Sequence, residues 1–474
     1  PELRMVSSGK LTQLERQLQE NISTKAALCK DMVLLRARER VIENLEFNRL
    51  KNLISYRDLN HEVTKKKKIW PLRKVIKNFK EEVLKVVPIW LASPESVSAI
   101  FPQLNVFDLV IFDEASQCFS ERGLPAIARA RQVVVAGDQQ QLKPSDFFKA
   151  RWDENHEDPD LEVESLLDLS SRHWLTLPLQ GHYRSQSPEL VQFSNIHFYK
   201  NKLELMPHCD WVNSKEKSME FIHVDGRWEN QSNIAEAEKV SELVLQLYIH
   251  SPNKEVGVIT FNQPQQMLVL DKIEEKFRAQ KATLPETLMV KNIENVQGDE
   301  KDIIVFSVGY AKDKQGRLAI QFGSLNSAGG ENRLNVAITR AREKIVLVCS
   351  IFPAELNTDS AKNEGPKLLR DYLQFVKSVS EGNNKREISK MQLSFDWYLK
   401  HKLTLPVNKI VYDFFPNADI TIEKNGIFKN IILTDDEFYQ QSLTVKQHHA
   451  MLPKLLEEKH WNYTSLYSRN FWLD

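Results

Sequence analysis

The chain has 474 residues, 42% of them hydrophobic and 27% charged, and its 64 Lys and Arg equal its 64 Asp and Glu. These values are typical of a globular protein of two to four domains. The charge balance excludes a protein that binds nucleic acid through a global basic charge, so any such site must be a local groove.

Four cysteines occur, Cys29, Cys118, Cys209 and Cys349, and they form no CxxC pair. This pattern predicts neither a zinc site nor a disulfide framework, and it favours the reducing cytoplasm. No apolar run reaches the roughly 18 residues that span a membrane, so no membrane partner is expected. The chain opens on Pro1 without a signal peptide, and we expect it to be a piece of a longer polypeptide.

Apolar residues recur at roughly helical spacing in the first 87 residues, which contain no proline between Glu2 and Trp70. We expect long amphipathic helices there, arranged as an antiparallel pair. The basic run at 65–68, followed by Trp70, either touches a nucleic-acid backbone or is a solvated helix end.

From Pro88 onward, apolar runs alternate with helical patterns, which predicts an α/β fold. Strands are expected at 88–93, 107–112, 132–138, 256–261, 302–308 and 344–350, a helix at 234–249 and a linker at 152–164. The predicted domains are a helical insert at 1–87, the C-terminal part of a first lobe at 88–160, a second lobe at 161–385 and a small α/β unit at 386–474.

Two adjacent carboxylates, Asp113 and Glu114, end the apolar run at 107–112. They occupy the carboxyl end of a predicted parallel strand, which is where ligands of such sheets bind. The first carboxylate can hold Mg²⁺, and the second can orient and deprotonate an attacking water. A strand followed by two acids is common, so this pattern alone does not establish a site.

Further polar groups follow predicted strands or lie in turns. Asp138 and Gln141 come after the strand at 132–138, where Gln141 can sense a phosphate through its amide or simply belong to a polar strand exit. Arg184 lies in a polar turn and can form a fork onto phosphate oxygens, or it is a surface arginine packed on Tyr183.

Small polar side chains at strand ends are candidates for binding a nucleic-acid phosphate. Thr260 and Asn262 end the strand at 256–261, although an N-cap for the next helix explains Asn262 equally well. Ser93 ends the strand expected at 88–93 and is assigned to the same class of contact.

Gln297, Gly298 and Glu300 form a turn before the strand at 302–308. Gly298 permits close approach of the backbone to a ligand, unless the stretch is a simple turn. Arg340 and Arg342 are expected on a short helix that precedes the strand at 344–350. Arg340 as an arginine finger would stabilise charge on a transferred phosphoryl group, and a solvated basic helix is the alternative.

In this order, the motifs DEASQ, GDxxQL, HYRS, VQGxEKD and LNVAxTRAR resemble the motor motifs of superfamily 1 helicases. The likeness is greatest to the group that contains the nonsense-mediated-decay RNA helicase and its DNA-acting relatives. It covers about residues 88–375 and implies two RecA-like lobes with parallel sheets, the first of them incomplete, and ATP in the cleft between them. It also implies 5′-to-3′ movement on single-stranded nucleic acid, with DNA favoured over RNA.

The resemblance assigns roles to individual residues. It implies that Asp113 holds Mg²⁺, Glu114 activates water and Gln141 senses the γ-phosphate. Arg184 and Arg340 would reach the same phosphate. Gln297 and Glu300 would couple nucleotide to nucleic acid, and Asp138 and Gly298 are placed with them at the nucleotide.

One motif of this family, the P-loop GxxxxGK[ST], is missing from the sequence. The nearest match, SSGKLT at 7–12, lacks the first glycine and has Leu11 directly after Lys10. Either the P-loop lies upstream in a longer protein, which the intact remaining motifs favour, or the motor is inactive. An inactive motor would leave a nucleic-acid-binding or nuclease-associated effector.

The end of the chain, at 431–442 and 455–474, is similar to very-short-patch-repair-like endonuclease domains, in which a Glu-x-Asp pair holds the catalytic metal. Leu433 and Asp435 fall at those two places, with Asp419 as a candidate third acid. The loss of the first acid predicts a degenerate nuclease-like domain, and a folded α/β cap with surface acids is the alternative.

Overall fold

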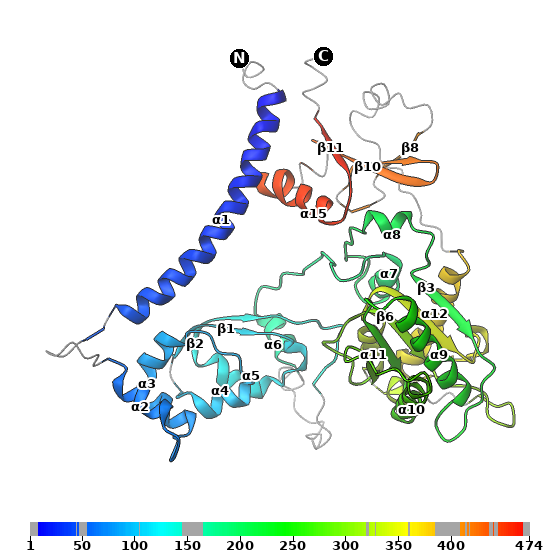
Figure 1. Cartoon of the computed structure of the whole chain (residues 1–474), viewed down its shortest axis with the longest axis horizontal. Helices are drawn as coiled ribbons and strands as arrows, with labels where there is room; N and C mark the ends of the chain where they lie inside the picture. Colours follow the sequence, from blue (N-terminus) through cyan, green and yellow to red (C-terminus); the bar gives the residue numbers. More distant parts are fainter. Residues whose placement is uncertain are drawn as a thin grey trace. The chain divides into compact units, whose positions relative to one another are not determined.

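The structure is a computed structural model. It describes residues 8–43, 45–46, 55–103, 105–144, 165–318, 322–327, 329–358, 361–383, 408–412, 415–416, 418–435, 439 and 444–467. The chain divides into two compact units (Figure 1). Unit 1 comprises Pro1–Gln139 and Lys143–Thr176, and unit 2 comprises Gln140–Leu142 and Leu177–Asp474. The linker expected at 152–164 lies outside the described residues.

Unit 1 begins with helices. The helical prediction for this region is confirmed by α1 (Ser8–Ile42), α2 (Arg57–Thr64) and α3 (Leu72–Val86). In place of the expected pair of long helices, the described residues of this region form one long helix and two shorter ones. Leucines of α1 such as Leu34 and Leu35 remain exposed, whereas α3 buries Ile76 and Val83 in a small apolar cluster that includes Phe101.

The rest of unit 1 is built on a two-stranded parallel sheet. It contains α4 (Pro94–Ile100), β1 (Phe107–Phe112), the 3₁₀ turn η2 (Ala115–Gln117), α5 (Ser120–Ile127), β2 (Ala130–Val135) and α6 (Leu166–His173). The strand predicted at 88–93 is wrong, because these residues have no regular secondary structure. A strand requires a neighbour for its backbone hydrogen bonds, and Leu91 of this segment is 97% exposed.

Unit 2 contains a five-stranded, all-parallel sheet in the order β3-β7-β6-β4-β5. Its strands are β3 (Met219–His223), β4 (Val256–Thr260), β5 (Met289–Asn292), β6 (Lys301–Ser307) and β7 (Ala341–Cys349). Its helical elements are α7 (Glu189–His197), α8 (Cys209–Asn213), α9 (Ile234–His250), α10 (Gln263–Ala279), η3 (Gly323–Asn326), α11 (Gly330–Ile338), η4 (Pro353–Glu355) and α12 (Glu364–Ser380). The strands and the helix predicted for this region are confirmed to within a few residues.

Both faces of this sheet are covered, which explains why its strands read as continuous apolar runs. Successive residues of β6 point to opposite faces. Ile303 and Val305 pack in a cluster with residues of α9 and α10. Ile304 and Phe306 belong to a second cluster, with residues of α7, α11 and α12. The sheet is therefore the middle layer of unit 2.

The C-terminal part of unit 2 is a four-stranded sheet in the order β11-β10-β9-β8. Its elements are β8 (Asn408–Tyr412), β9 (Ile420–Lys424), β10 (Ile427–Thr434), the π-helical turn η5 (Gln447–Met451), α15 (Leu452–Glu458) and β11 (Tyr463–Leu466). β10 pairs with β11 in parallel and with β9 antiparallel. Asn213 of α8 joins this sheet by hydrogen bonds to the backbone N–H and carbonyl of Phe428.

The predicted α/β class is confirmed. Each unit contains a parallel sheet, as expected for two RecA-like lobes. The sheet of unit 1 shows two strands among the described residues, and a smaller mixed sheet with helices follows at the C-terminal end. Within the described part of the chain, no helix is long and apolar enough to cross a lipid bilayer.

Candidate functional site

The acid pair of unit 1 lies where the sequence predicted it, directly after β1. Asp113 and Glu114 are both exposed, and the Asp113 carboxylate accepts a 3.0 Å hydrogen bond from the backbone N–H of Glu114. Glu114 has a φ of 52° and leads into η2. A non-glycine residue in this left-handed region is uncommon and marks a sharp turn of the chain. Here the turn leaves two carboxylates in solvent at the end of a strand.

The exits of β1 and β2 are held side by side. The N–H of Ala115 donates to the carbonyl of Ala136 over 2.9 Å, and the N–H of Ala136 donates to the carbonyl of Phe112 over 2.8 Å. A Cβ atom at Gly137 would lie 3.0 Å from the Ala115 nitrogen, so a larger residue would push the two strand exits slightly apart. Asp138 therefore follows β2 beside the acid pair that follows β1.

Gln141 groups with unit 2. Its backbone carbonyl accepts a 2.9 Å hydrogen bond from the Asn332 side chain, and the carbonyl of Gln140 accepts one of 2.8 Å from Asn335. Both asparagines lie on α11. Leu142 packs against the apolar cluster on the α11 face of the unit 2 sheet. Two asparagine side chains thus anchor the backbone around Gln141. Only Asn335 belongs to the sequence motif LNVAxTRAR, and Asn332 precedes it.

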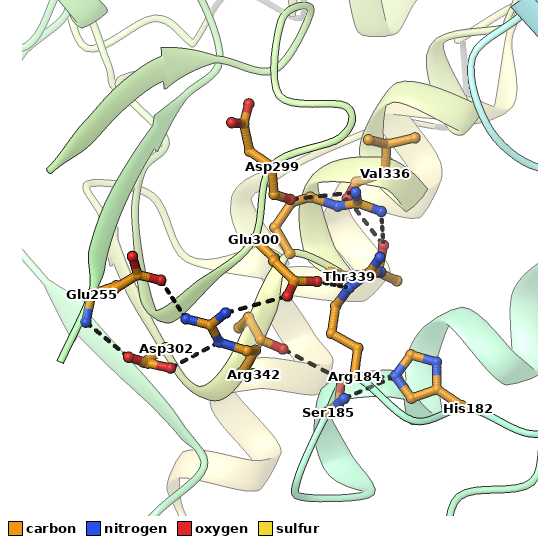
Figure 2. A network of polar contacts seen from close by, with 12 residues as sticks. His182, Arg184, Ser185, Glu255, Asp299, Glu300, Asp302, Val336, Thr339 and Arg342 are labelled. Carbon is orange, nitrogen blue, oxygen red and sulfur yellow. Dashed lines mark hydrogen bonds and ion pairs between the residues drawn. The ribbon is translucent and has the colours of Figure 1, made fainter. Parts of the chain in front are cut away.

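A charged network surrounds Glu300 in unit 2 (Figure 2). Arg184 donates from Nε to Glu300 Oε2 over 2.7 Å, and Arg342 donates from Nη1 to Glu300 Oε1 over 3.2 Å. Arg342 also pairs with Asp302 and Glu255. The hydrogen bond from Arg184 lowers the pKa of Glu300, against the opposing effect of partial burial. Glu300 is therefore a carboxylate that holds two arginines at once.

Arg340 lies beside this network and differs from it in burial. Its side chain is 2% exposed and donates to the carbonyls of Val336 and Asp299 and to the Thr339 hydroxyl. The expected position of Arg340 and Arg342 on a helix is wrong, because α11 ends at Ile338 and β7 begins at Ala341. Arg340 occupies the turn between them, and Arg342 belongs to the strand.

His182 fixes the turn that carries Arg184. The backbone N–H of Ser185 donates to His182 Nε2 over 3.1 Å, so this nitrogen carries no proton. Burial, followed by the nearby Arg184 charge, lowers the pKa of His182 to about 4. The ring is consequently neutral at physiological pH, and its acceptor nitrogen orders the backbone next to Arg184.

The candidate nucleic-acid residues have capping or buried positions. Asn262 is the N-cap of α10 and accepts a 2.7 Å hydrogen bond from the N–H of Gln265. Thr260 is fully buried at the end of β4 and donates to the carbonyl of Asn262 over 2.9 Å. Ser93 in unit 1 caps α4 through the N–H of Ser96. Each of these side chains has a structural role in this structure.

A buried polar cluster that the sequence motifs did not indicate lies next to Thr260. Glu236 accepts hydrogen bonds from the Ser307 hydroxyl, the Gly309 N–H and the Asn233 amide. Gln265 donates to Ser307 and to the backbone carbonyl of Asn233. Burial raises the pKa of Glu236 to about 7. No local sequence signal predicts this cluster, because its members come from α9, α10 and the end of β6.

The predicted site residues of unit 2 separate into two groups at opposite ends of the parallel sheet. Gln297, Gly298 and Glu300 precede β6, and Arg340 precedes β7, so they lie at the amino ends of these strands. Gly298 has a φ of 85° with open space around it, as its turn requires. Thr260 is the last residue of β4 and Asn262 follows it, so both lie at the carboxyl ends. The partners of Arg342, Glu255 and Asp302, were missed, although Asp302 is the last residue of the VQGxEKD motif.

Two of the three C-terminal positions expected at a metal site are buried. Leu433 is buried in β10 among the apolar residues of the C-terminal core. Asp419 is also buried and accepts a 2.8 Å hydrogen bond from the N–H of Thr434. Asp435 follows β10 and is half-buried.

Two family models match the chain, and both are described as an AAA domain. One covers residues 163–351 and the other covers residues 4–146. Among curated proteins, an uncharacterized ATP-dependent helicase of Mycoplasma genitalium is 37% identical over 65% of this chain and 29% of its own length. A regulator of nonsense transcripts 1 homolog of Drosophila melanogaster is 27% identical over 51% of this chain and 21% of its own.

A solved structure, the helicase of PRRSV, aligns with 74% of this chain and with 50% of its own chain. The sequence identity is 12% and the TM-score is 0.25. The chain spans less than a third of the length of the two Mycoplasma relatives, of which the second is also an ATP-dependent helicase. Two segments of the chain thus match AAA-domain models, and the chain is similar in sequence to proteins named ATP-dependent helicases.

Proposed function

We propose that this chain is part of a superfamily 1 helicase or translocase that couples ATP hydrolysis to movement on single-stranded nucleic acid. The observation that carries the proposal is the placement of Asp113, Glu114 and Asp138 at the adjacent exits of two parallel strands. Ligands of open α/β sheets bind at this edge. The relationship to ATP-dependent helicases supports the same conclusion.

The residues fit a magnesium nucleotide in part. Asp113 offers the exposed hard oxygen that Mg²⁺ prefers, and it would hold the ion. When bound, Mg²⁺ neutralises phosphate charge. This sequence does not contain the P-loop that would form a backbone cradle for the phosphates. ATP hydrolysis is therefore measured on a polypeptide that carries this chain together with a P-loop.

Each group then has a defined task. Glu114 accepts the proton of the attacking water, because its carboxylate is exposed and stands one residue beyond Asp113. The resemblance to superfamily 1 helicases assigns to Arg184 and Arg340 the donation of hydrogen bonds to phosphate oxygens as charge develops on them. Arg184 is better placed than Arg340 to reach a ligand, because its side chain is 23% exposed. The donors of Arg340 are instead directed at carbonyls and a hydroxyl of unit 2. Gln141 senses the γ-phosphate. Gln297 and Glu300 couple the bound nucleotide to the nucleic acid.

For the nucleic acid we propose single-stranded DNA in preference to RNA, bound along the carboxyl edge of the unit 2 sheet. Asn262 follows β4 at that edge, and polar side chains at a strand end suit contact with a backbone phosphate. Binding of this kind has little sequence preference.

The test is ATP hydrolysis stimulated by single-stranded DNA and by RNA. Glu114→Gln should retain ATP binding and lose turnover, because the amide cannot accept a proton. Glu81→Gln, on an exposed position of α3, is the matched control and should hydrolyse ATP like the parent. Turnover of Glu114→Gln at the parental rate would overturn the assignment of the acid pair.

A second function, a nucleic-acid-binding effector with an inactive motor, is favoured by the missing GxxxxGK[ST] motif. It predicts binding of single strands without ATP turnover, even in the longest natural polypeptide. Steady ATP turnover that requires Glu114 would exclude it.

A further inference from the structure

Two histidines and an aspartate meet where the second lobe joins the C-terminal domain. His208 is the residue before α8, Asp210 lies in its first turn, and His460 follows α15. One ligand atom of each lies within 4.8 Å of the other two. The two segments are about 250 residues apart in sequence, so only the tertiary structure brings these groups together.

The backbone that carries the three side chains is fixed by bonds between the same two segments. The N–H of Cys209 donates to the carbonyl of Lys459 over 2.9 Å. The indole of Trp461, which is buried, donates to the carbonyl of Pro207 over 2.8 Å. Each histidine therefore lies next to a residue that bonds across the junction, and the Cα positions of the cluster are set before any ion arrives.

The side chains themselves are close and accessible. His460 Nδ1 and Asp210 Oδ2 lie 2.6 Å apart, and both side chains are more than 60% exposed. The rings of His208 and His460 meet edge to face, with centroids 5.4 Å apart. A tetrahedral zinc ion needs its ligand atoms about 3.4 Å apart, given zinc–nitrogen distances of about 2.0–2.1 Å. Rotation of exposed side chains covers the difference, and solvent access provides the entry path.

We propose that His208, Asp210 and His460 bind a divalent ion of the zinc class, with water as the fourth ligand, and that the ion ties the C-terminal domain to α8. Two imidazoles and one carboxylate favour Zn²⁺ and similar transition ions, whereas Mg²⁺ and Ca²⁺ prefer sites built from oxygen alone. The site is separate from the residues assigned to ATP, all of which lie on other elements.

Lys459, next to the proposed site, allows a further test of ion binding. Lys459 precedes His460 and interacts electrostatically with His208. A positive charge so close to a bound cation weakens its binding. Removing this charge should therefore tighten binding of the ion, whereas a purely structural role of the cluster gives no reason for such a change.

The experiment titrates Zn²⁺ into the tag-free 474-residue chain by calorimetry, with Mg²⁺ in a parallel titration. We expect one Zn²⁺ per chain and no Mg²⁺ at this site. His208→Ala and His460→Ala should each weaken Zn²⁺ binding by about 100-fold or more. Loss of a residue that only hydrogen-bonds to a metal ligand already weakens metal binding by about 10- to 100-fold. Asp210→Asn should weaken it less, and Lys459→Gln should strengthen it. His250→Ala, at an exposed position on α9, is the control and should bind Zn²⁺ like the parent.

A second measurement follows thermal unfolding by circular dichroism. Zn²⁺ should raise the Tm of the parent and of His250→Ala, because a ligand that binds only the folded state stabilises it. It should not raise the Tm of His208→Ala or His460→Ala, whose Tm without zinc should match that of the parent. The proposal is overturned if the parent binds no Zn²⁺, or if the two histidine variants bind it as tightly as the parent.

Discussion

Arg184 and Glu300 form an ion pair of 2.7 Å between two motifs that are 116 residues apart in the sequence (Figure 2). The second oxygen of Glu300 accepts from Arg342, so one carboxylate sets the position of both guanidinium groups. A side chain held in this way is pre-organised for a planar ligand, because little rotamer freedom remains to be lost.

The first prediction concerns the strength of this pair. A double-mutant cycle with Arg184→Ala and Glu300→Ala should give a coupling of about 0.5–1 kcal/mol in urea unfolding, since both side chains are partly exposed. The pair Lys272–Glu275 on α10, whose carboxylate is more exposed, should give a smaller value. The depressed pKa of Glu300 means that its contribution is present above about pH 4.5 and is lost as the pH falls. A coupling near zero at neutral pH would contradict this arrangement.

The second prediction separates the two arginines assigned to phosphate. Arg340→Ala should lower the free energy of unfolding by about 3 kcal/mol, because it leaves buried acceptors without their donor. Arg184→Ala should cost much less stability. In a P-loop-containing polypeptide both variants should lose hydrolysis by about 10³. Arg333→Ala on α11 is the control, with little change expected in either quantity.

Unfolding and ATPase measurements on the same samples distinguish the roles. If Arg340→Ala loses stability but keeps parental turnover under conditions where it is folded, Arg340 acts only within its own lobe. Arg340→Lys should restore little of either property, because one ammonium cannot donate in the directions of the planar guanidinium.

The third prediction concerns pH and the buried Glu236. Its pKa is raised by burial from 4.5 to about 7, so the folded protein keeps a proton that the unfolded chain releases. The free energy of unfolding should therefore fall as the pH rises between about 4.5 and 7. Glu236→Gln should remove this component, whereas Glu238→Gln, at an exposed position on the same helix, should retain it. Urea unfolding across this pH range gives the slopes, and equal slopes for the parent and Glu236→Gln would contradict the prediction.

The fourth prediction concerns the C-terminal domain. We expect no Mg²⁺- or Mn²⁺-dependent cleavage of plasmid DNA, because Leu433 falls where the resemblance to nuclease domains puts the first metal-binding acid, and it is packed in the core. One carboxylate fewer leaves a hard divalent ion under-coordinated. Incubation of the chain with plasmid and each metal tests this. Cleavage that Asp435→Ala abolishes would show that Asp435 acts in a working nuclease site.

The sequence by itself determined the α/β class, the strands β1, β4, β6 and β7 and the helix α9. These elements are read from local patterns, since a parallel strand buried on both faces is a continuous apolar run and α9 carries a helical repeat. Local patterns do not show which strand finds a neighbour, and residues 88–93 are apolar yet unpaired with any described strand. Only the tertiary structure decided that Arg340 is buried in a turn, that Glu300 holds two arginines, and that His208 and His460 meet. The partners of Glu300 and the two histidines are tens to hundreds of residues apart in the sequence. Their contact depends on how packed elements bring distant side chains within the few ångströms over which hydrogen bonds and metal coordination act.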